Sequence, residues 1–183
     1  IKVAFNYYQQ AAANSRNPLI QVEAQLNQVS LHIEQSDWQK ALNLLPKIQS
    51  QLDNLPLSRS SIYASINFAK SLSKLMQVPG VTTSLNVDAA KIIARGLKQA
   101  ETLKDLRAQA YALAQLGNLY EQTNQFNEAL KLSRQALQIA QNINASDITY
   151  QVAWQVGRIL KNQGNIKDAI PAYNSSIKVL GTL

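Results

Sequence analysis

Three short stretches of the chain repeat one pattern of polar and apolar positions. Each has a polar residue, a bulky apolar residue, two polar residues, an alanine and an aliphatic residue, in that order. The stretches lie at residues 37–42, 125–130 and 165–170. Because self-similarity is the sequence signature of a repeat architecture, the pattern predicts a stack of similar helical units. Such a stack is typical of a binding surface rather than a reaction centre.

A small residue precedes two of the repeated alanines by the same interval. Gly117 precedes Ala129 and Gly157 precedes Ala169, and the intervals are equal because 129 − 117 = 169 − 157 = 12. The period between the two units is 169 − 129 = 40. A small residue lets two helices approach closely where they cross, and apolar residues three and four positions away fill the space around the crossing. The spacing therefore predicts pairs of packed helices.

The same register extends toward the N-terminus. Counting back 12 from Ala41 places Val29 at the glycine position, and another 40 residues from there places Ala69 at it. The interval from Ala69 to Ala89 is 89 − 69 = 20 instead of 12, so we expect an insertion near residues 77–84, where Pro-Gly indicates a turn. The predicted helices span residues 2–15, 18–35, 37–54, 58–77, 86–104, 106–123, 126–143, 147–163 and 166–180.

The order of these helices predicts how the chain is divided. Residues 1–16 follow the pattern of a second helix alone, so the chain is expected to begin with half of a repeat. One array is expected, with helix pairs at 18–54, 58–104, 106–143 and 147–181. Pro46 and Pro171 fall inside predicted second helices, where each removes a backbone donor and is expected to bend the helix.

The motif residues resemble the tetratricopeptide repeat family. The family pattern has Leu-Gly-x-x-Tyr in the first helix and Ala, an aromatic residue and Ala in the second, and it is matched by Leu116, Gly117, Tyr120, Ala129 and Ala136. The next unit matches through Gly157, Ala169 and Tyr173, whereas the first two units lack the glycine and the tyrosine. The resemblance implies an all-α fold, a right-handed α-solenoid of antiparallel helix hairpins with about nine helices. The spacing of 40 is longer than the family's usual ~34.

In this family the first helix of each pair lines the inner, concave surface. The same register here selects the following residues: Glu23, Leu26, Ser30, Ile33, Glu34, Tyr63, Ile66, Lys70, Ser73, Lys74, Tyr111, Ala114, Asn118, Glu121, Gln122, Gln151, Trp154, Arg158, Lys161 and Asn162. Aromatic anchors beside cationic side chains suit an extended or helical peptide of acidic character. The candidate peptide-binding residues are Tyr63, Lys70, Lys74, Tyr111, Asn118, Trp154, Arg158 and Lys161. Alternatively, the cations are ordinary solvated side chains and the aromatics pack against the adjacent repeat.

The charge of the chain supports a second hypothesis. The formal net charge is +7, with 18 Lys and Arg residues against 11 Asp and Glu, but the cations are scattered singly. A basic surface with aromatic residues also suits nucleic acid, and binding through phosphates would weaken steeply with salt. We therefore keep two hypotheses, a scaffold that binds a protein or peptide and a helical repeat that binds nucleic acid.

The residue inventory argues against catalysis. The chain has no cysteine and one histidine, His32, so it can assemble neither a thiolate nucleophile nor a His-based metal cluster, nor a Ser-His-Asp triad that relies on a partner histidine. The glycines form no phosphate-binding string, and the acidic residues show no metal-like spacing. We predict a protein that is not an enzyme and that has no metal or cofactor.

The ends of the chain indicate a wider context. The sequence does not begin with Met and has neither a signal-peptide layout nor a long apolar run, so we expect a segment of a longer protein and leave its compartment open, with the cytoplasm as the default. Residues 168–183 resemble the last repeat before a CHAT domain, a caspase-like module of bacterial proteins, which implies that the array regulates or targets a protease outside these residues. Helices without a covering neighbour at both ends predict some self-association.

Overall fold

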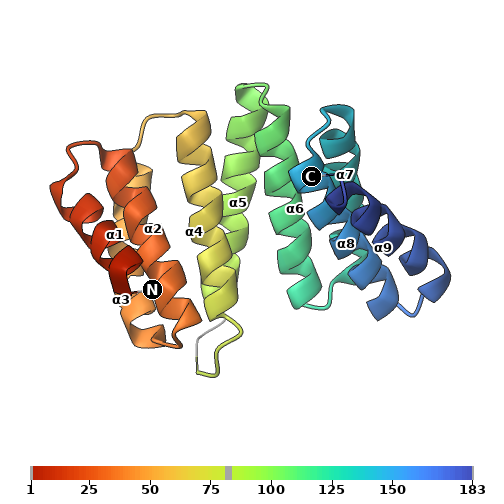
Figure 1. The fold of residues 1–183 in the computed structure, drawn as a ribbon, viewed down its shortest axis with the longest axis horizontal. Coiled ribbons are helices and arrows are strands. Elements are labelled where there is room, and N and C mark those ends of the chain that lie inside the picture. The colour runs from red at the N-terminus through yellow and green to blue at the C-terminus, as the bar shows by residue number, and fades with distance from the viewer. Residues whose placement is uncertain (1, 81–83, 183) are drawn as a thin grey trace. The chain divides into compact units, whose positions relative to one another are not determined.

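The ordered elements of this protein are helical. A computed structural model describes residues 2–80 and 84–182, and in this part of the chain it contains nine α-helices and no strand (Figure 1). They are α1 (Lys2–Asn14), α2 (Pro18–Glu34), α3 (Trp38–Asp53), α4 (Arg59–Leu75), α5 (Ser84–Thr102), α6 (Leu106–Gln122), α7 (Phe126–Asn142), α8 (Ser146–Asn162) and α9 (Ile166–Leu180). Each end lies within two residues of the predicted one, so the helices expected from periodicity are confirmed.

The chain forms two compact units, Ile1–Ile92 and Ile93–Leu183, and the boundary falls inside α5. The prediction of one continuous array stays a prediction. Gln77, Val78, Pro79 and Gly80 form the described part of the expected insertion, and Gly80 has a positive φ of 89°. Residues 81–83 of the insertion lie outside the described residues, and Ser84 begins α5.

In the first unit, α2 is the central helix. It packs against α1, α3 and α4, and α3 also contacts α4. The core contains Val22, Val29, Ile48, Ile62 and Phe68, all of them almost fully buried. Burying an aliphatic or aromatic side chain contributes roughly 1.5–3 kcal/mol each, so this core holds the helices together.

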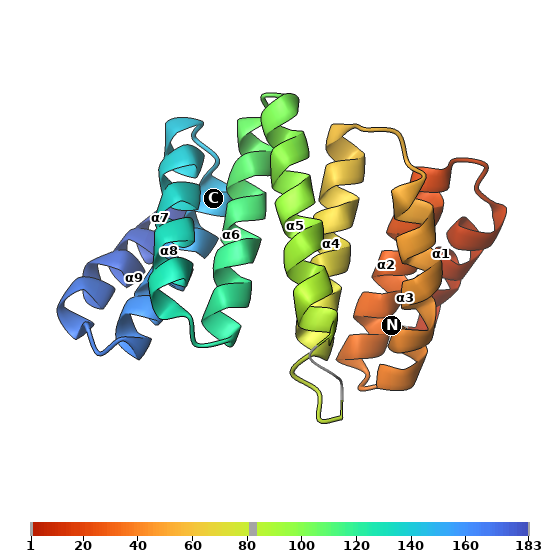
Figure 2. The same ribbon diagram turned by 180° about the vertical axis from the view of Figure 1, so that it is seen from behind.

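In the second unit, the helix starts are evenly spaced, at Leu106, Phe126, Ser146 and Ile166. Figure 2 shows α6, α7, α8 and α9 from behind. Consecutive helices contact one another, and α6 also contacts α8. A Cβ atom built on Gly157 would lie 2.8 Å from the ring of Tyr173 on α9. The predicted close approach of helices at this glycine is therefore confirmed.

Within the described chain, five helix ends share one turn. Its central residue has a positive φ of 53–78°, and the N–H of the next residue donates to the carbonyl oxygen five positions back at 2.8–2.9 Å. This is the Schellman arrangement, which satisfies carbonyl groups that a helix end leaves without partners. The central residues are Ser36, Lys104, Asn124, Asn144 and Gly164.

Two prolines stand inside helices, as predicted. Pro46 lies within α3 and Pro171 within α9, and both helices continue beyond them. The expected bend at each proline stays a prediction.

Candidate functional site

A groove lies between α2 and α4 in the first unit. The two helices contact each other and run in the same direction (Figure 1). The cavity has a volume of about 400 Å³. Its lining residues are Glu23, Leu26, Asn27 and Ser30 from α2, and Tyr63, Ala64, Asn67, Lys70, Ser71 and Lys74 from α4. Both helices are the first helices of predicted pairs, so the groove lies on the face that the register assigned to binding.

The groove combines buried apolar residues with an exposed polar rim. Leu26 and Ala64 are buried, while Asn27 and Asn67 are exposed. The ring of Tyr63 is half-buried. Leu26 and Ala64 give the groove an apolar patch, and the amides of Asn27 and Asn67 can donate and accept hydrogen bonds, a combination that is common in binding grooves.

Two lysines and one glutamate carry the charge of the groove. Lys70 and Lys74 are one helical turn apart on α4, and Glu23 belongs to α2. Lys70 is half-buried, and burial lowers its pKa below 10.5, with the charge of Lys74 adding to the effect. No ion pair joins Glu23 to either lysine among the side chains that the structure describes.

The register predicted part of this lining and missed the rest. Ile66 and Ser73, expected on the inner face, are buried instead: Ile66 is 0% exposed, and the Ser73 hydroxyl donates to the carbonyl oxygen of Ala69 at 3.0 Å. Residues on either side of the predicted row line the groove, among them Asn27 and Asn67. The register selected only one row of positions on each helix. Two parallel helices enclose a groove with the flanks of both, so the lining includes positions on either side of that row.

In the second unit, Arg158 on α8 is joined to α6. Its Nε and Nη2 atoms donate to the Glu121 carboxylate at 2.6 and 2.7 Å, and Nη2 also donates to Asn118 Oδ1 at 3.3 Å. Glu121 is 8% exposed, so an acidic residue expected on the inner face is buried. The hydrogen bond with Glu121 raises the pKa of Arg158. The candidates Asn118 and Arg158 are thus brought together, and each already has a partner.

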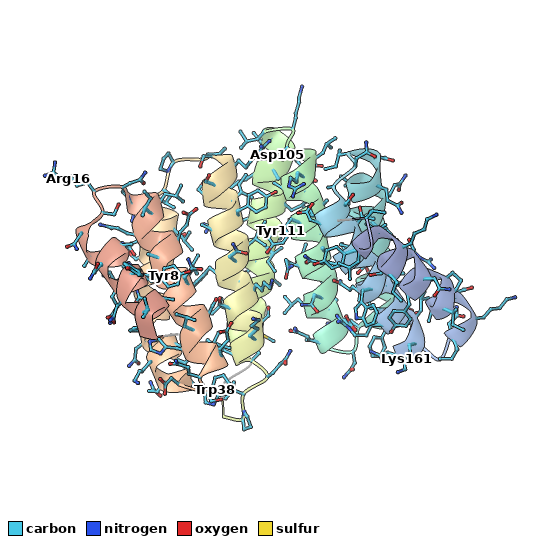
Figure 3. All side chains as sticks on the ribbon, in the orientation of Figure 1. Tyr8, Arg16, Trp38, Asp105, Tyr111 and Lys161 are labelled. Atoms are coloured by element: carbon cyan, nitrogen blue, oxygen red, sulfur yellow. The ribbon has the colours of Figure 1, made fainter. Side chains whose placement is uncertain are left out.

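The aromatic candidates of the second unit differ in exposure. Trp154 is 48% exposed, and its ring meets that of Tyr173 edge to face with centroids 4.7 Å apart. Tyr111 is half-buried and packs against the buried cluster around Ala110 and Val152, as the packing interpretation expected for some aromatics. Figure 3 shows Tyr111 along α6 and Lys161 near the end of α8, where it is exposed.

A buried polar network escaped the sequence analysis. Gln155 Nε2 on α8 donates to the carbonyl oxygen of Ala114 at 3.0 Å and to Ser133 Oγ at 2.8 Å. The Ser133 hydroxyl in turn donates to the carbonyl oxygen of Ala129 at 2.7 Å. The network joins α6, α7 and α8, which shows that Gln155 is a structural residue.

The described residues offer little for metal binding or for a membrane. No group of three or more His, Cys, Asp or Glu residues that could hold a metal ion occurs among them. Of the described helices, none has both the length and the apolarity that crossing a membrane requires.

Comparisons with known proteins agree with this fold. The family model of the tetratricopeptide repeat matches residues 107–181. No curated protein sequence matches the chain. A Rap protein complexed with competence and sporulation factor is 15% identical, has a TM-score of 0.76, and aligns over 97% of this chain and 48% of its own. The chain therefore spans about half the length of that protein.

Two further solved structures are similar over most of both chains. The kinesin light chain TPR-like repeats of Podosopora anserina are 13% identical with a TM-score of 0.69, covering 92% of this chain and 78% of that one. BtubC (BKLC) from P. vanneervenii is 14% identical with a TM-score of 0.75, covering 100% and 74%.

The fold and the family match define the class as an all-α repeat protein built from helix hairpins, which confirms the predicted fold class. The resemblance to the tetratricopeptide repeat is confirmed as well, and residues 107–181 carry the family's own pattern. The resemblance to a repeat that precedes a CHAT domain stays a prediction.

Proposed function

We propose that this chain is a protein-interaction scaffold and that the groove between α2 and α4 binds an extended peptide segment of a partner protein. The observation that carries the proposal is the groove itself, which is lined by Tyr63, Lys70 and Lys74 from α4 and by four residues of α2. Repeat proteins commonly use the surface formed by successive helices for binding.

The dimensions of the groove suit an extended chain. Its lining on α4 reaches from Tyr63 to Lys74, and at 1.5 Å per helical residue this span is about 16 Å. About five residues of extended peptide cover that length. The amides of Asn27 and Asn67 suit peptide N–H and C=O groups, while Leu26 and Ala64 suit an apolar side chain.

The similar structures support binding of another molecule without identifying it. The Rap protein was solved as a complex with competence and sporulation factor. Because the identity to this chain is 15%, the likeness supports the scaffold role and leaves the ligand to be determined from the groove.

We assign a second contact surface to α8. Trp154 is large and exposed, its ring meets that of Tyr173 edge to face, and Lys161 follows it two turns later. Rigid aromatic residues supply much of the energy of protein interfaces, so Trp154 is proposed as an anchor for a partner. Arg158 and Asn118 support this surface through their bonds to each other and to Glu121, and Tyr111 supports it through packing.

The proposal contains no reaction step. The sole histidine, His32, is buried, its ring meets Phe5 edge to face, and its Nδ1 atom lies 3.5 Å from Asp37 Oδ2. This histidine is not among the residues that line the groove. A catalytic site needs a base, an orienting partner and a pocket in one place. We therefore propose a role in binding alone.

Peptide display tests the proposal. A random peptide library is selected on the immobilised chain, and selected peptides are measured against Asn27→Trp, which fills the groove from an exposed position, and against Lys131→Met, a matched surface change on α7. Peptides that bind the wild type and Lys131→Met but lose about tenfold or more in affinity for Asn27→Trp are expected. Selected peptides that bind all three proteins equally contradict the proposal.

A titration with nucleic acid tests the second hypothesis. Fluorescent single-stranded RNA and DNA are titrated at near-physiological salt, where binding through scattered cations is expected to be weak. Firm binding that disappears when Lys70, Lys74 and Lys161 are all changed to Met, in a variant that keeps the wild-type circular dichroism spectrum, would overturn the peptide proposal in favour of nucleic acid.

A further inference from the structure

The charges of the groove are separated along its length. In the register of the repeat, Tyr63 corresponds to Glu23 and Lys70 corresponds to Ser30, since 63 − 23 = 70 − 30 = 40. Because α2 and α4 contact each other and run in the same direction, the register places Glu23 opposite Tyr63, and Lys70 seven positions further along, opposite Ser30. Seven helical residues rise by about 10 Å. The groove therefore has an acidic end and a basic end.

The basic end holds cations without a counter-charge. Lys70 is half-buried and Lys74 is one turn away, yet no carboxylate pairs with either of them among the described residues. Glu34, the other acidic residue in the predicted inner row of α2, does not line the groove. Two like charges that share a partly buried site repel each other, and an added anion between them removes this repulsion.

We propose that Lys70 and Lys74 form a subsite for a peptide carboxylate and that Glu23 takes a cationic side chain of the same peptide about three residues away. The distance follows from the groove, since three residues of an extended chain cover about 10 Å. This inference rests on the proposed function, because it describes the ligand of the same groove. It selects a segment that carries both signs of charge at a fixed separation.

The glutamate argues against a polyanion in this groove. A nucleic-acid strand or a row of phosphates would place negative charge along the whole length, including the end at Glu23. Like charges across an interface cost binding energy and exclude wrong partners. A peptide with one acid and one base instead places each charge beside its opposite.

The display selection tests this inference through the composition of the peptides. One library has its C-terminus fused to the carrier, so that only side-chain carboxylates are available, and a second has a free C-terminus. Peptides selected on the wild type are expected to carry an acid and a base about three residues apart. Peptides selected on Lys70→Met/Lys74→Met are expected to lack the acidic residue, and peptides selected on Glu23→Gln are expected to lack the basic residue. Acid-dependent binding in the second library alone assigns the subsite to a terminal carboxylate.

Synthetic peptides then give the size of the effect. An acetylated and amidated selected peptide is expected to bind Lys70→Met/Lys74→Met about tenfold or more weakly than the wild type, and to bind Lys131→Met unchanged. The inference is overturned when groove-dependent peptides carry no acidic residue or keep their affinity for the double variant, in which case the proposed function stands. When no selected peptide depends on the groove, both this inference and the proposed function are contradicted.

Discussion

Arg158 on α8 donates two hydrogen bonds to the carboxylate of Glu121 on α6, at 2.6 and 2.7 Å. The two residues are 37 positions apart and belong to successive helix pairs. Paired geometry of this kind is the strongest that an arginine makes with a carboxylate. The side chain of Glu121 is almost fully buried, so the pair is a structural connection between the two helices as well as part of a candidate surface.

Removing the cation from this pair should destabilise the second unit. In Arg158→Met the buried Glu121 carboxylate loses its main partner, and leaving a buried charged group unpaired costs about 2 kcal/mol or more. Urea unfolding followed by circular dichroism measures the midpoint. Arg134→Met, a change of an exposed arginine on α7, is the control. Equal midpoints for the two variants would contradict the structural role of the pair.

Gly117 should not tolerate alanine. An alanine normally stabilises a helix interior by about 1 kcal/mol relative to glycine. A Cβ atom at Gly117 would lie 2.5 Å from Ser133 Oγ, 2.9 Å from Gln155 Nε2 and 3.1 Å from the carbonyl oxygen of Ala129. The added methyl group must therefore disrupt the buried hydrogen bond between Ser133 and Gln155, and we expect Gly117→Ala to lower the thermal midpoint. An unchanged or raised midpoint would show that the crossing is looser than described.

Lys70 should make the stability of the first unit dependent on alkaline pH. Burial lowers its pKa in the folded state below the ordinary 10.5, so between the two values the unfolded state binds more protons. Stability then increases as pH rises through the folded pKa and levels off above the unfolded one. Lys70→Met removes this contribution. The free energy of unfolding of the variant should therefore exceed that of the wild type by more at about pH 7 than at about pH 10. A difference in unfolding free energy that stays the same at the two pH values would contradict the effect of burial.

Self-association should depend on the outer face of α9. Ile170 and Ile177 are 55% and 60% exposed. The residues one period earlier, Leu130 and Leu137 on α7, pack against a buried cluster that includes Val156 of α8. Because α9 presents the same positions without such cover, concentration-dependent association is expected, and Ile170→Lys/Ile177→Lys should reduce it. Light scattering measures the mass, and a strict monomer at high wild-type concentration would count against the prediction.

Two substitutions at the shared helix-end turn should change stability in opposite directions. A residue with a side chain is strained at positive φ, so Lys104→Gly should stabilise the protein by about 0.5–1 kcal/mol, although glycine also raises the entropy of the unfolded chain. Gly164→Ala, at the equivalent turn, should destabilise it by about 1 kcal/mol. Unfolding midpoints compare the two, and changes of the same sign in both would rule out this account.

Most of the fold could be predicted from periodicity, because the residues on one helix face recur at a spacing that is visible in the sequence. The motif alanines Ala41, Ala129 and Ala169 are buried where the repeat predicted them. The turns at Ser36 and Lys104 were not predicted, since neither residue type favours a positive φ. The equivalent turns hold Asn124, Asn144 and Gly164, and asparagine and glycine are the residue types that adopt a positive φ most readily.

The candidate site was less predictable than the fold. The register gave the direction in which Lys70 and Tyr63 point, because direction depends on one helix alone. It could not give the pairing of Arg158 with Glu121, or the burial of Ile66, because both depend on how closely a second helix approaches. Side-chain partners so far apart in sequence leave no local signal.

Among the described residues, five helix ends finish in the same backbone state, with the same hydrogen bond closing each turn. A segment of one helix pair, such as the stretch from Lys104 to Asn144 or from Asn124 to Gly164, therefore begins and ends with equivalent turns. Removing or adding one segment requires no new loop to be built, only a matching apolar face on the neighbouring helix. The number of binding surfaces along such a chain can thus change in whole steps, while each surface keeps its own side chains and its own specificity.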